Sequence, residues 1–195
     1  MAVSLPLRVA RAAVARSHPA PGAVAHGVRH RHGRVPLWGI GAVLYGPSEP
    51  VTHLFDRVGV ADCDRFHAQV GDPAFNTLWE ALAVLVALRE WADRFSPDRP
   101  VEIRSDNLGV LYALYNRAAP ARAINLIMQE VSLAEALWDF PLRALKHIPG
   151  LSNVTADALS RQFDPKPKDF PAELLAVTRT HVAHRTRKWY RTLKA

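Results

Sequence analysis

The chain has 195 residues, of which 49% are hydrophobic and 22% charged, so it can bury the core of one domain, and wholesale disorder is excluded. No apolar run approaches the roughly 18 residues needed to cross a bilayer, and a lone cysteine cannot form an internal disulfide. We expect an intracellular protein without a membrane partner, with the nucleus or cytoplasm favoured as its compartment.

The formal charge of +7 is carried by the two ends of the chain. Residues 1–48 hold six Arg and no acid, and residues 174–195 hold six Arg or Lys and no acid. The segment between them has 13 basic and 18 acidic side chains, a formal charge of −5. Nucleic-acid binding inferred from charge therefore rests on the ends alone.

Residues 1–22 are predicted to be a basic, disordered arm. Three arginines spaced among alanine and valine also fit an organellar transit peptide, which keeps an organelle open as the compartment; they are Arg8, Arg11 and Arg16. A third interpretation is that Met1 is an internal start within a longer coding sequence.

The rest of the chain alternates strand and helix patterns, which predicts an α/β domain with a mixed sheet. Strands are expected at residues 37–44, 51–60, 101–105 and 142–148. Helices are expected at residues 76–95, from 107 to about 117, and at 123–138 and 154–161. Residues 162–195 are predicted to form a Pro- and Lys-rich linker followed by a basic helical tail.

Three acids occupy predicted element ends: Glu80 early in the long helix, Asp106 after a strand and Asp157 in the last short helix. Each has a structural explanation. Glu80 fits a capping box with Thr77, Asp106 fits a helix cap, and Asp157 fits a first-turn acid favoured by the helix dipole.

Taken together, the three acids indicate a site that binds a divalent cation. The carboxyl end of a strand in an α/β fold faces the ligand crevice, which is where Asp106 is expected. Three converging acids repel one another unless a divalent cation neutralises them, and Mg²⁺ prefers carboxylate oxygens. His147, ten residues before Asp157, is placed to carry protons beside such a site, or is simply a histidine at a strand end.

At residues 147–161, HIPGLSNVTADALSR resembles the closing motif of ribonuclease H domains, particularly those attached to retroelement reverse transcriptases. SDNLGVLYALYNR at 105–117 is similar to the family's Asp-Asn strand end, and NTLWEALAVLVAL looks like its glutamate helix. The resemblance covers residues 23–161. The motifs at 105–117 and 147–161 are similar to those of retrotransposons that encode a tyrosine recombinase.

This resemblance implies a ribonuclease H-like, mixed five-stranded sheet flanked by helices, and hydrolysis of the RNA strand of RNA/DNA hybrids. Two Mg²⁺ ions, or Mn²⁺ in their place, would be held by carboxylates, with an adjoining reverse transcriptase domain as protein partner. By position, Glu80, Asp106 and Asp157 match three of the family's four carboxylates, and His147 matches its histidine. Asn107 and Asn153 would be supporting residues.

The family's first carboxylate, an aspartate on the strand before the hairpin, has no counterpart, because no acid precedes Glu49. The segment GAVAHGV is the best candidate for that strand and would put His26 in its place. Neutral imidazole is a poor Mg²⁺ ligand beside oxygen donors. Losing a bridging carboxylate is expected to cost on the order of several kcal/mol of transition-state stabilisation.

Two functions therefore compete. The first is an Mg²⁺-dependent ribonuclease H, with Asp56 as the nearest substitute carboxylate. The second is a catalytically degenerate ribonuclease H fold that binds nucleic acid or survives as a retroelement fragment. A third interpretation is an unrelated α/β domain in which the three acids only cap helices. The tail is expected to contact nucleic acid by stacking and charge through Arg185, Arg187, Lys188, Trp189 and Tyr190. The alternative is a solvated amphipathic helix, because nothing in the spacing requires a nucleic-acid partner.

Overall fold

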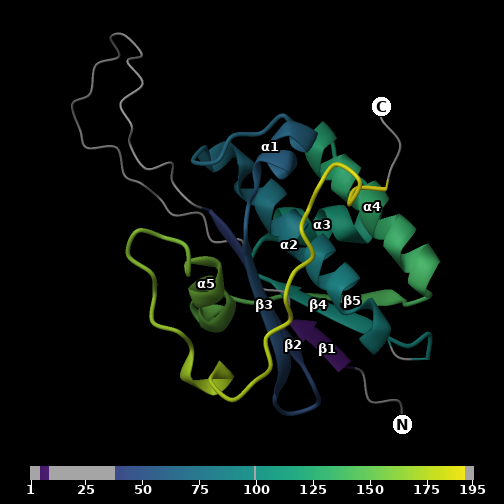
Figure 1. Cartoon of the computed structure of the whole chain (residues 1–195). Coiled ribbons are helices and arrows are strands. Elements are labelled where there is room, and N and C mark those ends of the chain that lie inside the picture. Colours follow the sequence, from purple (N-terminus) through teal and green to yellow (C-terminus); the bar gives the residue numbers. More distant parts are fainter. Residues whose placement is uncertain (1–4, 9–37, 99, 192–195) are drawn as a thin grey trace.

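The structure is a computed structural model that describes residues 5–8, 38–98 and 100–191 (Figure 1). Its centre is a mixed sheet with the strand order β3-β2-β1-β4-β5. Strand β2 runs antiparallel to β1 and β3, while β4 runs parallel to β1 and β5. The strands are β1 (Leu5–Arg8), β2 (Gly39–Tyr45), β3 (Pro50–Arg57), β4 (Val101–Ser105) and β5 (Leu142–His147).

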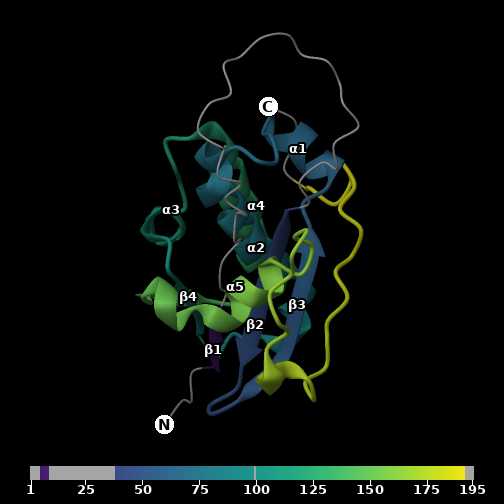
Figure 2. The same ribbon diagram turned by 90° about the vertical axis from the view of Figure 1, so that its left-hand side faces the viewer.

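Five α-helices are described, and Figure 2 shows α5 on a different side of the sheet from the other four. In the described residues, no helix is both long enough and apolar enough to cross a membrane. The α/β class expected from the sequence is confirmed, although α1 was not predicted. The helices are α1 (Val60–Phe66), α2 (Asn76–Glu90), α3 (Leu108–Asn116), α4 (Arg122–Trp138) and α5 (Val154–Ser160).

Strand β2 shows how the sequence builds two packed layers. Ile40, Ala42 and Leu44 belong to the large core beneath α2, α3 and α4, whereas Val43 packs with α5. Alternate side chains of a strand point to opposite faces, so a single strand serves both layers. On the α5 side, Gly39 and Gly41 let the helix backbone approach, because a Cβ on Gly41 would lie 2.7 Å from the backbone nitrogen of Ser160.

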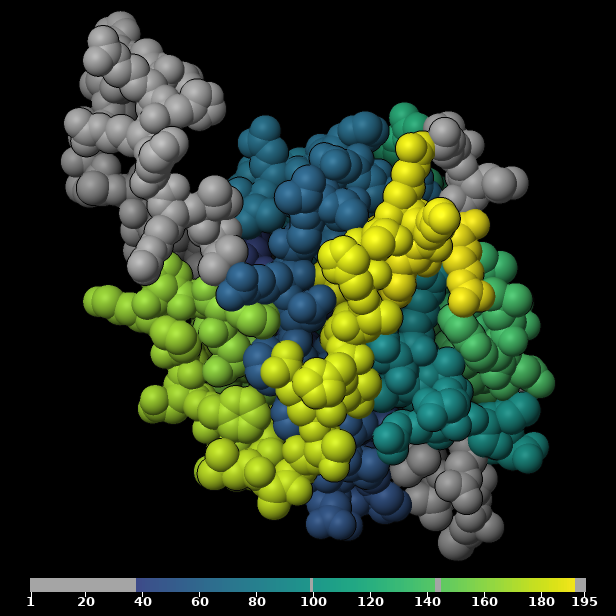
Figure 3. All heavy atoms as spheres, in the orientation of Figure 1, coloured from purple at the N-terminus to yellow at the C-terminus, as the bar shows by residue number. Residues whose placement is uncertain are grey.

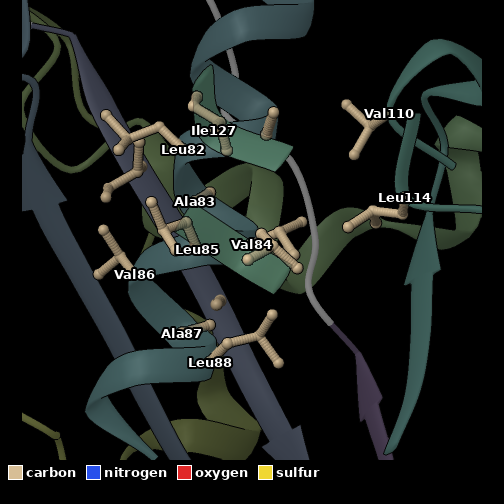
Figure 4. Packing of buried hydrophobic residues seen from close by; sticks show 14 of the residues in the cluster. Leu82, Ala83, Val84, Leu85, Val86, Ala87, Leu88, Val110, Leu114 and Ile127 are labelled. Atoms are coloured by element: carbon tan, nitrogen blue, oxygen red, sulfur yellow. The ribbon is translucent and has the colours of Figure 1, made fainter. Parts of the chain in front are cut away.

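Helix α2 is the centre of the core, because it is apolar on all sides. Every residue from 78 to 88 is buried, including the acidic Glu80. Figure 4 shows Leu82, Leu85 and Leu88 packed among side chains from neighbouring elements, such as Ile127 of α4. A helix that is hydrophobic all round is a buried helix, which agrees with the sequence-based expectation for this segment.

The amino-terminal strand differs from the expected one. We expected the strand beside the hairpin within residues 23–29 and an arm outside the domain at 1–22. Instead Leu5–Arg8 lies between β2 and β4, with Leu7 opposite both Leu44 and Ile103. The described strand is therefore built from residues 5–8, and His26, which we expected in it, lies outside the described residues.

The carboxyl-terminal segment also differs from expectation, since residues 175–191 form no helix. After a 3-10 turn at Ala172–Leu174 the chain is extended and pairs with the outer edge of β3 through a parallel bridge between His53 and Arg179. Figure 3 shows this segment, in yellow, lying along the surface of the domain. We call residues 175–191 the C-terminal strap. It covers the β3 edge, which would otherwise present unpaired backbone groups.

Candidate functional site

The carboxylate of Asp106 follows the last residue of β4 and is held by the segment leading into α5. Its Oδ1 accepts a hydrogen bond of 2.8 Å from Nδ2 of Asn153. A Cβ on Gly150 would stand 3.2 Å from its Oδ2, so the turn at Gly150–Ser152 packs closely against the carboxylate. Asp106 is half-buried at the strand end where ligands bind in α/β folds.

Asn153 connects the end of β4 to the start of α5. It is 4% exposed, and its backbone carbonyl accepts a 3.1 Å hydrogen bond from the N–H of Asp157. Its own N–H donates to the carbonyl of Gly150. One buried amide therefore fixes the position of Asp106 relative to the first turn of α5.

Asn107 links the same strand end to α2. Its Oδ1 accepts from the N–H of Val110 and caps α3, while its Nδ2 donates to Oγ1 of Thr77 over 3.2 Å. Thr77 is thus not the cap of α2, which begins at Asn76 without a side-chain cap bond. The capping box considered for Thr77 and Glu80 is therefore not formed.

Glu80 lies one helical turn after Thr77, so both side chains share the face of α2 that meets the end of β4. Glu80 is only 9% exposed. Burial of a carboxylate is unfavourable unless charge or hydrogen bonds compensate it. Glu80 is thus a buried acid one turn along α2 from Thr77, which contacts Asn107.

Asp157 faces two cations. Its Oδ1 accepts a 3.1 Å hydrogen bond from Nε of Arg161, one turn further along the chain, and its Oδ2 pairs with Nζ of Lys168. Asp157 is 4% exposed, and it lines an open pocket of about 440 Å³ together with Lys168. The other residues lining this pocket are Gly150, Leu151 and Val154.

The three acids do not form a metal-binding cluster among the described residues. In residues 5–8, 38–98 and 100–191, no group of three or more His, Cys, Asp or Glu side chains could hold a metal ion. The expectation that Glu80, Asp106 and Asp157 converge on one ion is therefore not met in this structure.

His147 is the last residue of β5 and pairs in register with Ser105, the residue before Asp106. Its side chain is exposed, beside the equally exposed Lys146. The β4–β5 pairing thus sets the imidazole next to the strand end that carries Asp106.

Burial also acts on a neighbouring acid. Asp164 lies 3.8 Å from Nη1 of Arg161, and desolvation raises the pKa of its carboxyl although Arg161 and Lys168 oppose the shift. Asp157 adds to the increase by like-charge repulsion. The two cations beside α5 are thus shared between two carboxylates.

Two of the five tail residues expected to contact nucleic acid are buried in the fold. Arg185 is 5% exposed and Tyr190 6% exposed, and Trp189 lies with its ring 4.3 Å below the guanidinium carbon of Arg89. Only Arg187 and Lys188 of this set are exposed. The polar groups of Arg185 and Tyr190 bind acids within the domain instead.

The sequence reasoning missed the two cations that pair with Asp157. The spacing of four residues between Asp157 and Arg161 is a usable signal, since such pairs share a helix face. Lys168 carried no such signal, because it reaches Asp157 from a segment beyond the helix. Its position depends on how residues 162–171 fold back over the sheet.

The strand order and the helices on both faces of the sheet form an α/β fold like that of solved ribonuclease H1 structures. Solved structures share this fold. Ribonuclease H1 from Halobacterium salinarum NRC-1 superimposes with a TM-score of 0.51 at 21% identity, covering 68% of this chain and 89% of that one. LC11-RNase H1, solved in complex with an RNA/DNA hybrid, gives a TM-score of 0.50 at 18% identity, covering 68% and 87%. No family model and no curated protein matches the sequence.

Proposed function

We propose that this domain binds nucleic acid, with the RNA/DNA hybrid as its preferred form, and does not cleave it by metal catalysis. The observation that carries the proposal is the pairing of Asp157 with Arg161 and Lys168. A carboxylate already neutralised by two protein cations has little remaining charge to offer a divalent ion. The ribonuclease H fold and the hybrid bound to LC11-RNase H1 support the choice of ligand.

The donor set does not fit two Mg²⁺ ions. A two-ion site needs a bridging carboxylate, and the chain has no acid before Glu49, while β1 is built from Leu, Pro, Leu and Arg. Asp56, the nearest alternative considered, pairs with Arg185 over 2.5 Å. Asp106 is held by Asn153, and Asp157 by two cations. These residues favour phosphate binding over phosphodiester hydrolysis.

Exposed cations near the candidate site supply the contacts that hybrid binding needs. Lys146 precedes His147 at the end of β5, and Lys166 and Lys168 lie in the segment that follows α5. Side chains of this type bind phosphates, and each contact releases counterions from the nucleic acid. Binding would therefore weaken steeply as the salt concentration rises.

A metal-dependent ribonuclease H is the second candidate. It is favoured by the order of Glu80, Asp106 and Asp157 along the chain, which agrees with the family's order. The motif at residues 147–161 favours a retroelement origin for either function, with a reverse transcriptase domain as neighbour.

One experiment separates the two candidates. The purified chain is incubated with a labelled RNA/DNA hybrid in Mg²⁺ or Mn²⁺, and binding is measured in parallel by fluorescence anisotropy. We expect salt-dependent binding and no cleavage. Cleavage that is lost in Asp106→Asn would establish the enzyme instead, because a contaminating nuclease would be unaffected by that substitution.

Lys168→Met tests the proposed contact surface. The substitution removes a phosphate-binding charge and leaves Asp157 less compensated, so hybrid affinity should fall roughly three- to tenfold and the salt slope by about one. The matched control is Lys188→Met in the C-terminal strap, which should stay within about twofold. Equal losses in both variants would contradict the assignment of the surface.

A further inference from the structure

A basic pocket lies between the end of α1 and the start of α4. Its volume is about 180 Å³, enough for a phosphate group with ordered water. Phe66 and Leu126, both buried, provide apolar walls. The lining residues are Arg65, Phe66, His67, Arg122, Ala123 and Leu126.

The ionisable side chains that line this pocket are all basic. Three of its six lining residues are basic side chains and none is acidic. Within the part of the chain that the structure describes, Arg122 and His67 make no side-chain ion pair. The buried acid of α1, Asp62, is already bound to Arg185 and Tyr190.

Backbone geometry adds to the positive potential. Helix α4 has 17 residues, its N-cap Ala121 offers no side-chain cap, and its first turn contains no acid. The first N–H groups of a helix have no intrahelical acceptor and carry the positive end of the helix dipole. Arg122 and Ala123, the first two residues of α4, therefore line a pocket that also has Arg65 and His67 in its wall.

The end of α1 lines the same pocket through Arg65, Phe66 and His67. His67 closes the helix in the left-handed conformation, with φ 50° and ψ 43°, and its backbone N–H bonds to the carbonyl of Cys63. The guanidinium carbon of Arg65 lies 5.9 Å from the ring centre of Tyr190, which belongs to the C-terminal strap. The strap thus helps to position one of the three basic groups.

We propose that this pocket is an anion subsite that takes one phosphate group, supplied by the backbone of a bound nucleic acid. The source of the phosphate rests on the proposed function, whereas the anion site itself does not. Arg122 would donate to the phosphate from the open side, and the first N–H groups of α4 from the wall. A guanidinium and backbone N–H groups at a helix start are donors suited to phosphate oxygens.

The anion site is tested by titrating the ¹⁵N-labelled full chain with inorganic phosphate, with chloride at equal ionic strength as the comparison. We expect the amide resonances of Arg122 and Ala123 to shift with phosphate in a saturable way. The shifts should be lost in Arg122→Gln and kept in Arg94→Gln, an exposed arginine elsewhere on the surface. Equal melting temperatures show that both variants are folded.

The source of the phosphate is tested by hybrid binding. Arg122→Gln should lower hybrid affinity roughly three- to tenfold and reduce the salt slope by about one, while Arg94→Gln should stay within about twofold. Phosphate shifts with unchanged hybrid affinity in Arg122→Gln would assign the pocket to a small phosphate compound and overturn the backbone source. Absence of saturable shifts overturns the anion site. If the chain binds no hybrid yet shows the shifts, the proposed function fails and the anion site stands.

Discussion

Arg185 and Asp62, separated by 123 residues in the sequence, form a buried ion pair in which Nη2 lies 3.0 Å from Oδ2. Their side chains are 3% and 1% exposed. Tyr190 donates its hydroxyl hydrogen to the same carboxylate, and burial followed by the charge of Asp62 raises the pKa of this phenol. The C-terminal strap is therefore part of the fold, joined to α1 through polar groups inside the protein.

Breaking this pair should destabilise the whole domain. Arg185→Met leaves the carboxylate of Asp62 buried with less compensation, and removing one partner of a buried pair costs about 3–5 kcal/mol. The free energy of unfolding is measured by urea titration. Arg187→Met, an exposed change in the same segment, should stay within about 0.5 kcal/mol. If both variants unfold alike, the strap is not held by Arg185.

The contact between α5 and β2 gives a second prediction. A Cβ on Gly39 would lie 2.2 Å from the carbonyl oxygen of Ser160, and one on Gly41 would lie 2.7 Å from the Cβ of Leu159. Since neither contact can relax without moving backbone, Gly41→Ala should destabilise by about 1–3 kcal/mol. Gly59→Ala, whose nearest neighbour would be 3.7 Å away, is the matched control in the same unfolding assay. A smaller loss at Gly41 than at Gly59 would show that α5 does not pack this closely.

The difference between expectation and structure follows from the range of the interactions involved. Helix α2 and strand β4 were predictable, because apolar spacing along 15 and 5 residues determines which side chains are buried. Strand β1 has only four residues, and its place depends on pairing with β2 and β4 far along the chain. Local periodicity cannot distinguish such a segment from residues 23–29.

The candidate site divides in the same way. The Asp-Asn strand end and the motif at residues 147–161 identified Asp106 and Asn153, which the structure joins by a hydrogen bond. The pairing of Asp157 with Lys168 is a tertiary contact across 11 residues with no regular spacing. Likewise, the basic residues of the strap looked exposed in the sequence, because their acidic partners lie on β3 and α1.

The hydrogen bond between Asn153 and Asp106 gives a third prediction. Asn153→Ala removes a buried donor to a carboxylate, and hydrogen bonds to charged groups contribute about 1.5–3 kcal/mol. We expect a loss of stability in that range by urea unfolding, together with weaker hybrid binding, because the turn at Gly150–Ser152 is no longer held against Asp106. Asn116→Ala, an exposed change at the end of α3, controls for the loss of an amide side chain. Unchanged stability in Asn153→Ala would mean that this bond does not hold the strand end.

The last prediction concerns pH and the aromatic group beside the strap. His53 is 3% exposed, and its ring centre lies 6.2 Å from that of Phe55 and 5.6 Å from that of Phe170. Its Nδ1 has no hydrogen-bond partner among the described residues. Desolvation, and then the charge of Arg179, lower the pKa of this histidine below the ordinary 6.5.

A lowered pKa in the folded state means that the unfolded chain takes up the proton first as the pH falls. The contribution of neutral His53 to the free energy of unfolding is therefore lost as the pH drops from about 6.5 toward the lower pKa of the folded state. Above that window the contribution is fully present.

His53→Phe should abolish this part of the pH dependence, whereas His147→Gln, at an exposed position, should retain it. The measurement is the unfolding free energy across pH 5 to 8, about the range in which an ordinary histidine titrates. Burial raises the pKa of Glu90 and Asp164, which act with the opposite sign, but they are present in both variants, so the difference between the two curves isolates His53. Parallel curves for His53→Phe and the unaltered chain would show that His53 is not held neutral by the fold.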